Sequence, residues 1–198
     1  MVVFPIGLGD ARLQAPVRAQ LDNLGNSVLG AHSTDESETL HTVPGDNATV
    51  MPLDELLPFG LGAVQMMKMD VQGFECKVLE GARNVLANGQ RLSGVVTEVT
   101  AAMLSRQCCG VQWLLHLLHL SGWEVKCNHR WGDSRMCTSL SPWAASSSSA
   151  VADRLAALGP LMRSSTLGHI NVPPLSRGQV KQVSQRRAKC RRRRAHGL

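Results

Sequence analysis

The chain has 198 residues, of which 43% are apolar and 18% charged, a composition typical of one globular domain with extensions. Its most apolar stretch, residues 111–120, is shorter than the roughly 20 residues that a membrane-spanning helix needs, so we expect no membrane span. The net charge of +6 comes from the end of the chain, because residues 177–198 hold nine Lys or Arg and no acid. The first ten residues lack the basic start of a secretory signal, so the sequence predicts an intracellular, cytoplasmic protein.

The first quarter of the chain predicts short elements. Residues 2–8 form an apolar run that ends at Gly7, Gly9 and Asp10, a pattern typical of a buried strand followed by a turn. Residues 11–50 are polar and rich in Gly and Pro, which predicts short strands and loops. Residues 51–57 then predict a brief helix that begins near Pro52.

Stronger patterns follow between residues 64 and 127. Residues 64–70 (VQMMKMD) and 94–99 (GVVTEV) predict two buried strands of a parallel sheet. Apolar residues at helical spacing predict helices over 75–86 and 111–120, and alternation predicts a strand over 123–127. Strands that alternate with helices predict an α/β fold of the Rossmann-like, doubly wound type with a mostly parallel sheet.

The end of the chain has no apolar periodicity. We predict three parts: a domain over residues 1–145, a serine-rich linker with a short helix over 146–176, and a disordered basic tail over 177–198. Arg191, Arg192, Arg193 and Arg194 predict nonspecific contact with a polyanion. An alternative function is therefore a scaffold whose tail binds nucleic acid or another polyanion.

The six cysteines contain no C-x-x-C pair, and the neighbouring Cys108 and Cys109 cannot easily bridge each other. We expect free thiols rather than a disulfide framework. Cys127, His129 and Cys137 are the only group that suggests a metal, but they offer three ligands without a fourth.

Two carboxylates lie where the predicted parallel strands end. Asp70 closes the first of these strands, and Glu98 lies near the end of the second. In parallel sheets, ligands gather beyond the carboxyl ends of the strands, so the pair could act on one hydroxyl or hold Mg²⁺ through Asp70. In a purely structural alternative, Asp70 caps the turn and Glu98 pairs with a surface cation.

Four blocks of sequence in the same order resemble the FkbM family of S-adenosylmethionine-dependent methyltransferases. They are Leu53-Asp54-Glu55-Leu56-Leu57, the segment from Met67 to Glu75 (MKMDVQGFE), Val78-Leu79-Glu80-Gly81-Ala82, and Val95-Val96-Thr97-Glu98. The family pattern is similar to "LDELL … KIDVEGFE … VLKGA … E". The resemblance covers about residues 1–130.

The resemblance implies O-methylation of a hydroxyl on a small metabolite or sugar, with S-adenosylmethionine as the methyl donor. It implies catalytic roles for Asp70 and Glu98 and cofactor contacts at Asn26, Ser27 and Gly73. Glu75 opens the helix after Gly73, where a carboxylate complements the helix dipole, so we assign it a structural role.

The chain departs from the family pattern in two ways. Gln72 stands where the family usually has Glu, which removes a charge but keeps hydrogen-bonding capacity. No glycine-rich loop that follows a strand and opens a helix occurs before Asp70. We therefore expect the chain to begin near the third strand of the domain, either as a fragment or as a relative that cannot bind the cofactor tightly.

Overall fold

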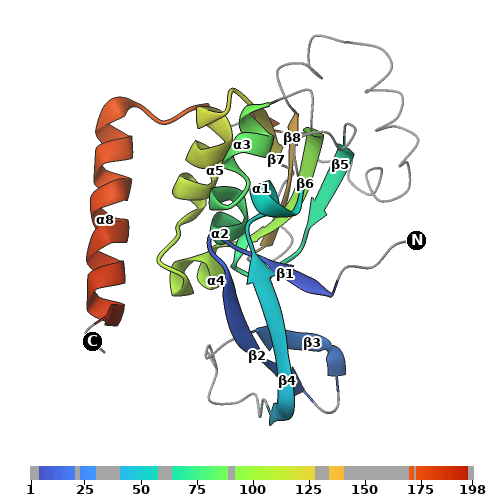
Figure 1. Cartoon of the computed structure of the whole chain (residues 1–198). Helices are drawn as coiled ribbons and strands as arrows, with labels where there is room; N and C mark the ends of the chain where they lie inside the picture. The colour runs from blue at the N-terminus through green and yellow to red at the C-terminus, as the bar shows by residue number, and fades with distance from the viewer. Residues whose placement is uncertain are drawn as a thin grey trace.

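A computed structural model of the chain describes residues 5–20, 23–29, 41–57, 64–88, 92–127, 134–140, 170–171 and 173–195. It has an α/β architecture with two small sheets and a set of short helices (Figure 1). Among the described residues, no helix is both long enough and apolar enough to cross a membrane. The predicted linker and its short helix lie almost entirely outside the described residues.

The first sheet has four strands in the order β1-β4-β2-β3. Here β1 pairs with β4 in parallel, and β2 is antiparallel to both β4 and β3. We predicted short strands and loops over residues 11–50, but polar residues there form strands of seven to eleven residues. Ladder hydrogen bonds between neighbours stabilise such strands even where the side chains do not alternate clearly. The bounds are β1 Ile6–Leu8, β2 Leu13–Gln20, β3 Asn23–Leu29 and β4 His41–Met51.

The second sheet has five strands in the order β5-β6-β8-β7-β9. Among the strands that the structure describes, β5 and β6 are the one parallel pair of this sheet, because β8 inserts in the opposite direction between β6 and β7. The sequence indicated β5, β6 and β7, but β8 is a partner that we did not predict. The bounds are β5 Val64–Met69, β6 Leu92–Thr100, β7 Glu124–Cys127, β8 Ser134–Leu140 and β9 Ile170–Asn171.

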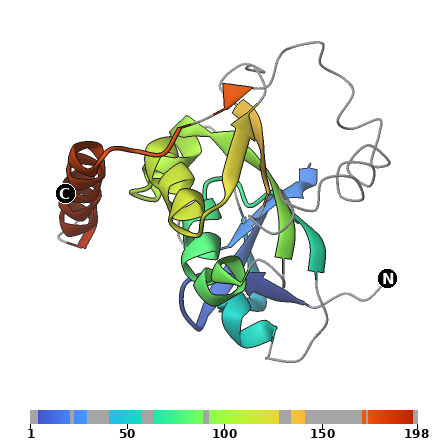
Figure 2. The same ribbon diagram turned by 90° about the horizontal axis from the view of Figure 1, so that it is seen from above.

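The helices of the body lie together on one face of the second sheet (Figures 1 and 2). Their apolar residues form a core with β5, β6 and β7, in which Trp123 is buried and donates its indole N–H to the carbonyl of Leu86 at 2.9 Å. The predicted helix over 75–86 is divided at Gly81 and Ala82. The bounds are α1 Leu53–Leu56, α2 Glu75–Glu80, α3 Arg83–Ala87, α4 Ala101–Arg106 and α5 Val111–Leu120.

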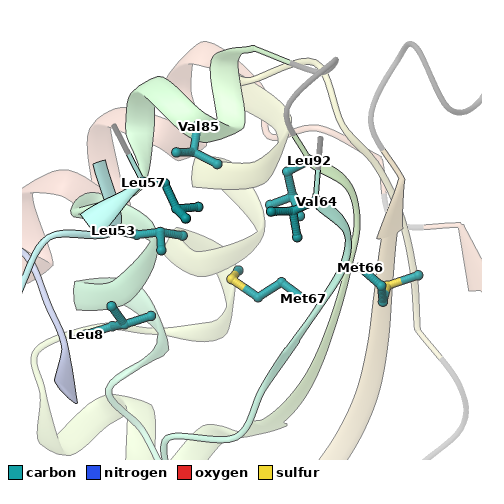
Figure 3. A pocket seen from close by; sticks show the side chains of 8 residues that line it. All are labelled: Leu8, Leu53, Leu57, Val64, Met66, Met67, Val85 and Leu92. Atoms are coloured by element: carbon teal, nitrogen blue, oxygen red, sulfur yellow. The ribbon is translucent and has the colours of Figure 1, made fainter. Parts of the chain in front are cut away.

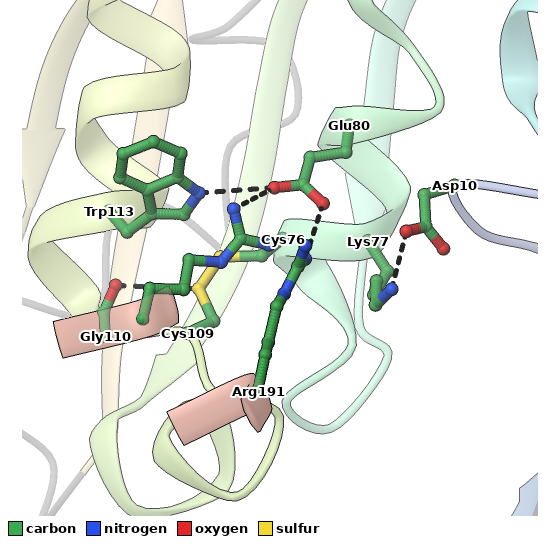
Figure 4. A network of polar contacts seen from close by, with 9 residues as sticks. Asp10, Cys76, Lys77, Glu80, Cys109, Gly110, Trp113 and Arg191 are labelled. Carbon is green, nitrogen blue, oxygen red and sulfur yellow. Dashed lines mark hydrogen bonds and ion pairs between the residues drawn. A yellow bond between two sulfur atoms is a disulfide. The ribbon is translucent and has the colours of Figure 1, made fainter. Parts of the chain in front are cut away.

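The first sheet contacts the body at the junction of α2 and α3. A Cβ added at Gly81 would lie 1.9 Å from the carbonyl oxygen of Gly9, so the two backbones approach as closely as glycine allows. Lys77 of α2 forms an ion pair with Asp10 at 2.5 Å (Figure 4). Asp54 accepts hydrogen bonds from two backbone N–H groups at the start of α3. These contacts hold the first sheet and α1 against α2 and α3.

The basic tail that we expected to be disordered forms the helix α8 (Arg177–Ala195), so that prediction is wrong for these residues. Arg, Lys, Gln and Ala are strong helix formers. The helix also has a capping box, because Ser176 and Gln179 exchange hydrogen bonds between side chain and backbone. Figure 2 shows α8 beside α5, outside the helical layer.

The expectation of free thiols is also wrong, because all six cysteines are paired. The pairs are Cys76–Cys109, Cys108–Cys190 and Cys127–Cys137. The adjacent Cys108 and Cys109 do not bridge each other but reach two different partners. The pairing of Cys127 with Cys137 removes two of the three ligands of the candidate metal site, and His129 lies outside the described residues.

Candidate functional site

Asp70 and Glu98 lie at neighbouring ends of parallel strands. Met69 of β5 pairs with Thr97 of β6, so the next residues, Asp70 and Glu98, stand at the same level of the sheet. Neighbouring strands are about 4.8 Å apart. The register thus gives the adjacency that the sequence indicated.

Glu98 projects away from the helical core. Met69 and Thr97 are buried, and Met69 belongs to the core under the helices. Because side chains alternate along a strand, Glu98 of β6 projects from the opposite face, while Asp70 is the first residue after the end of β5. Asp70 is exposed and Glu98 is half-buried, so both carboxylates are accessible to a ligand.

Two polar neighbours orient the Asp70 carboxylate. The side-chain amide of Gln72 donates a hydrogen bond to its Oδ1 at 2.7 Å. The Lys68 Nζ lies 3.6 Å from its Oδ2, with both side chains well exposed. The family's usual Glu at position 72 could not donate this bond, so Gln72 holds Asp70 in a way that a second carboxylate would not.

The turn after Asp70 has a left-handed backbone. Gln72 has a φ of 49° and Gly73 a φ of 98°. A Cβ at Gly73 would also lie 2.7 Å from the backbone of Met103 in α4. Glycine is therefore required here both by its conformation and by the close approach of α4. This is a structural reason for Gly73, which we predicted as a cofactor contact.

Glu75 is buried below this turn, with only 2% of its surface exposed. Its Oε1 accepts a hydrogen bond from the N–H of Gly73 at 3.0 Å, while its Oε2 has no partner among the described residues. Burial raises the pKa of Glu75, the backbone N–H groups around it oppose this effect, and the charge of Asp70 adds to the rise. The acid that we assigned to a helix terminus therefore holds the turn that carries Asp70.

Replacing Glu75 by Gln should flatten the dependence of stability on pH. A raised folded-state pKa means that its stabilising contribution is full below the unfolded pKa and is lost as the pH rises through the folded pKa. Glu75→Gln keeps the acceptor for Gly73 but cannot ionise. Urea unfolding from pH 4 to pH 8 should show that the variant gains stability relative to the wild type as the pH rises. Glu124→Gln, at an exposed position, should show the same pH dependence of stability as the wild type. A wild-type pH dependence in Glu75→Gln would contradict the raised pKa of Glu75.

Asn26 and Ser27 lie in β3, and the structure does not place them with Asp70. In the described residues β3 pairs only with β2, at the far edge of the first sheet from β1. The side chains of both residues lie outside what the structure describes. Their predicted contact with a cofactor stays a prediction.

An apolar cavity of about 170 Å³ lies at the other end of β5 (Figure 3). It is lined by aliphatic and methionine side chains near the starts of β5 and β6, including Val64, Met67 and Leu92. None of the predicted site residues lines it. Such a lining suits packed hydrocarbon and offers no partner for a charged ligand.

The comparison with known families bears on this arrangement. The family model described as "Methyltransferase FkbM domain" matches residues 4–131, which is well over half of the chain. The chain belongs to the FkbM methyltransferase family. No curated protein and no solved structure matches it. The match ends just after β7. It therefore includes β3, β5 and β6, the strands that carry or adjoin the predicted site residues, but not α8.

S-adenosylmethionine is the methyl donor that an FkbM domain implies, and the described residues fit it only in part. Asp70 directly follows β5 and Glu98 lies near the end of the parallel strand β6, the region where such sheets bind ligands. No glycine-rich strand–turn–helix precedes them in the sequence, and the cavity in Figure 3 has no polar lining. The described residues thus place two carboxylates near the ends of parallel strands but form no complete cofactor cradle.

Mg²⁺ remains a prediction without further support. Among the described residues, no group of three or more His, Cys, Asp or Glu side chains is placed to hold a metal ion. Asp70 and Glu98 would contribute two carboxylates, and the rest of an octahedral shell would have to come from water or substrate.

Proposed function

We propose that the chain is an S-adenosylmethionine-dependent O-methyltransferase that acts on a hydroxyl of a small metabolite or sugar. The observation that carries this proposal is the register of β5 and β6 within an FkbM domain, in which Met69 pairs with Thr97 and the next residues are Asp70 and Glu98. The five-stranded sheet would be part of a larger Rossmann-like, doubly wound sheet, and the domain would extend over residues 1–145.

Asp70 is the group that we assign to the acceptor hydroxyl. A hydroxyl oxygen becomes a good nucleophile when a base accepts its proton during methyl transfer. Asp70 is exposed, is oriented by Gln72, and follows the strand that pairs in parallel with β6, which carries Glu98. Glu98 would accept a second hydrogen bond from the acceptor and so hold it against Asp70.

Gly73, Asn26 and Ser27 are proposed as cofactor contacts on the strength of the family resemblance. For Gly73 the resemblance is the whole support, because α4 already packs where a side chain at this position would lie. S-adenosylmethionine would supply the methyl group on its sulfonium. The test is transfer of a labelled methyl group from S-adenosylmethionine to the small-molecule fraction of a cell extract, where label in a hydroxyl-bearing compound supports the proposal and no label above a no-enzyme control contradicts it.

The exposed cations of α8 favour a second proposal, contact with a polyanion. Arg192 and Arg193 are exposed, but Arg191 forms an ion pair with Glu80, and the side chain of Arg194 lies outside the described residues. The predicted set from 191 to 194 stays a proposal. The exposed cations of α8 outside its ion pairs with Glu80 include Arg186, Lys189, Arg192 and Arg193.

Changing these four residues to Gln should weaken binding to a fluorescent DNA duplex. Each lost phosphate contact should reduce the slope of log affinity against log salt by about 0.9. Fluorescence anisotropy at several salt concentrations measures both effects. Gln185→Ala is the matched control on the same helix, and an unchanged slope in the fourfold variant would remove this proposal.

The intracellular location stays a prediction. Disulfides persist mainly in oxidising compartments. The three pairs therefore favour an oxidising compartment over a strongly reducing compartment.

A further inference from the structure

The helix α8 is attached to the body by a disulfide and by a cluster around Glu80. Cys190 of α8 is bonded to Cys108, which follows α4, and their Cα atoms are 5.5 Å apart. Glu80, at the end of α2, forms ion pairs with Arg187 and Arg191 of α8. It also accepts a hydrogen bond from the indole N–H of Trp113 (Figure 4). Trp113 belongs to α5, the helix of the body that α8 also contacts.

The cluster buries charge. The side chain of Glu80 is 7% exposed and that of Arg187 is 10% exposed. The Arg187 guanidinium also lies 4.9 Å from the ring centre of Trp113. Burial raises the pKa of Glu80, but the hydrogen bond and charge of Arg187 outweigh it and leave that pKa below its ordinary value.

The non-covalent contacts between α8 and the body leave buried hydrogen-bond donors unpaired among the described residues. Two donors of Arg187, Nε and Nη2, are buried without a partner among the described residues. An unpaired buried donor carries a desolvation cost that offsets much of the ion pair. From Arg177 to Arg193, no residue of α8 is fully buried, so little apolar contact holds the helix in place.

The disulfide of α8 is also the most accessible of the three. Cys190 is half-buried, whereas Cys76, Cys108, Cys109, Cys127 and Cys137 are all buried. The other two disulfides join elements inside the body, with both sulfur atoms in the core. An external thiol can therefore reach the Cys190 sulfur more easily than any other.

We propose that Cys108–Cys190 is a reversible redox site that locks α8 onto the body, and that its reduction by a dithiol releases the helix. The dithiol supplies two electrons and is itself oxidised to a disulfide. Its thiolate attacks Sγ of Cys190, the bond to Cys108 breaks, and the electron pair and a proton go to Cys108. The second thiol of the reductant then displaces Cys190, which leaves as a thiol.

Release changes two surfaces of the molecule. It uncovers Glu80 and Trp113 on the body, and it frees the inner cations Arg187 and Arg191. The disulfide holds α8 near Glu80 at a high effective concentration, which the ion pairs lose when the bond is broken. The proposed redox site uses none of the residues that we assign to methyl transfer.

The test is limited digestion of the full chain by trypsin, with cleavage inside residues 177–195 followed by mass spectrometry. Cys190→Ser should be cleaved there at least about tenfold faster than the oxidised wild type. A mild dithiol should bring the wild type to the same rate without changing that of Cys190→Ser. Alkylation mapping in the same samples should show new thiols at Cys108 and Cys190 before any at the other four cysteines.

Two further variants keep the test decisive. Cys108→Ser should behave as Cys190→Ser, and unchanged cleavage within residues 92–127 shows that the body remains folded. Glu80→Gln with the disulfide intact should be cleaved at a rate closer to that of the oxidised wild type than to that of Cys190→Ser. Equal cleavage of α8 in the oxidised wild type and in both cysteine variants, or reduction of the buried pairs first, would overturn the proposal.

Discussion

Replacing Asp70 by Asn should reduce methyl transfer by about 10²- to 10⁴-fold, the usual contribution of a positioned base. The amide keeps the size of the side chain and its hydrogen bond with Gln72, but it cannot accept the hydroxyl proton. The rate of label transfer from S-adenosylmethionine measures the loss. Because Asp70 is exposed and outside the core, the midpoint of thermal unfolding should stay close to that of the wild type.

Two neighbouring variants separate proton transfer from positioning. Gln72→Ala removes only the bond that orients Asp70, so its loss should be smaller than that of Asp70→Asn. Glu98→Gln should raise the KM for the acceptor more than it lowers kcat, since we assign Glu98 to holding the hydroxyl. If Asp70→Asn retains most of the wild-type rate, the base is elsewhere and the assignment is wrong.

Replacing Gly81 by Ala should destabilise the folded chain by about 2–4 kcal/mol. The new Cβ would lie 1.9 Å from the carbonyl oxygen of Gly9 and 3.1 Å from Cα of Pro52, and neither backbone atom can move alone. The contact between the first sheet and α2 would have to open. Urea unfolding followed by tryptophan fluorescence measures the change.

Gly110→Ala is the matched control for this variant. A Cβ at Gly110 meets no atom within 4 Å, and the residue only precedes α5 without a side-chain cap. Its effect should stay within about 0.5 kcal/mol. Equal effects at the two positions would mean that the first sheet does not pack on α2 as described.

The sequence predicted the elements in which apolar periodicity is strong. The helix over 111–120 has the predicted bounds, and β5 ends next to Asp70 as expected, because both contribute a continuous apolar face to one core. The order β5, then helices, then β6 also placed Asp70 and Glu98 side by side. Local pattern was sufficient there, because a crossover helix forces two strands to run in parallel.

Other features depend on contacts between distant parts of the chain. Arg191 and Glu80 are 111 residues apart, and no local pattern indicates that they meet. The disulfide pairs and the insertion of β8 between β6 and β7 are likewise set by tertiary packing. The helix α8 did carry a local signal, the Ser176 and Gln179 capping box, which we overlooked because the segment has no apolar face.

Burial of a single carboxylate is equally hard to infer from sequence. Glu75 follows a glycine turn and opens a short helix, which is the usual place for an exposed acid. Its burial accompanies the close approach of α4 to Gly73, from whose N–H Glu75 accepts a hydrogen bond. The acid thereby becomes part of the turn that carries Asp70 rather than of the helix terminus alone.

Calorimetric titration of the chain with S-adenosylhomocysteine, the product of methyl donation, tests the central claim most directly. We expect saturable binding by the wild type, and the same affinity for Asp70→Asn, because we assign Asp70 to the acceptor and not to the cofactor. Absence of binding heat in a folded wild-type sample would contradict the methyltransferase function. Binding by the wild type that is lost in Asp70→Asn would contradict the role assigned to Asp70.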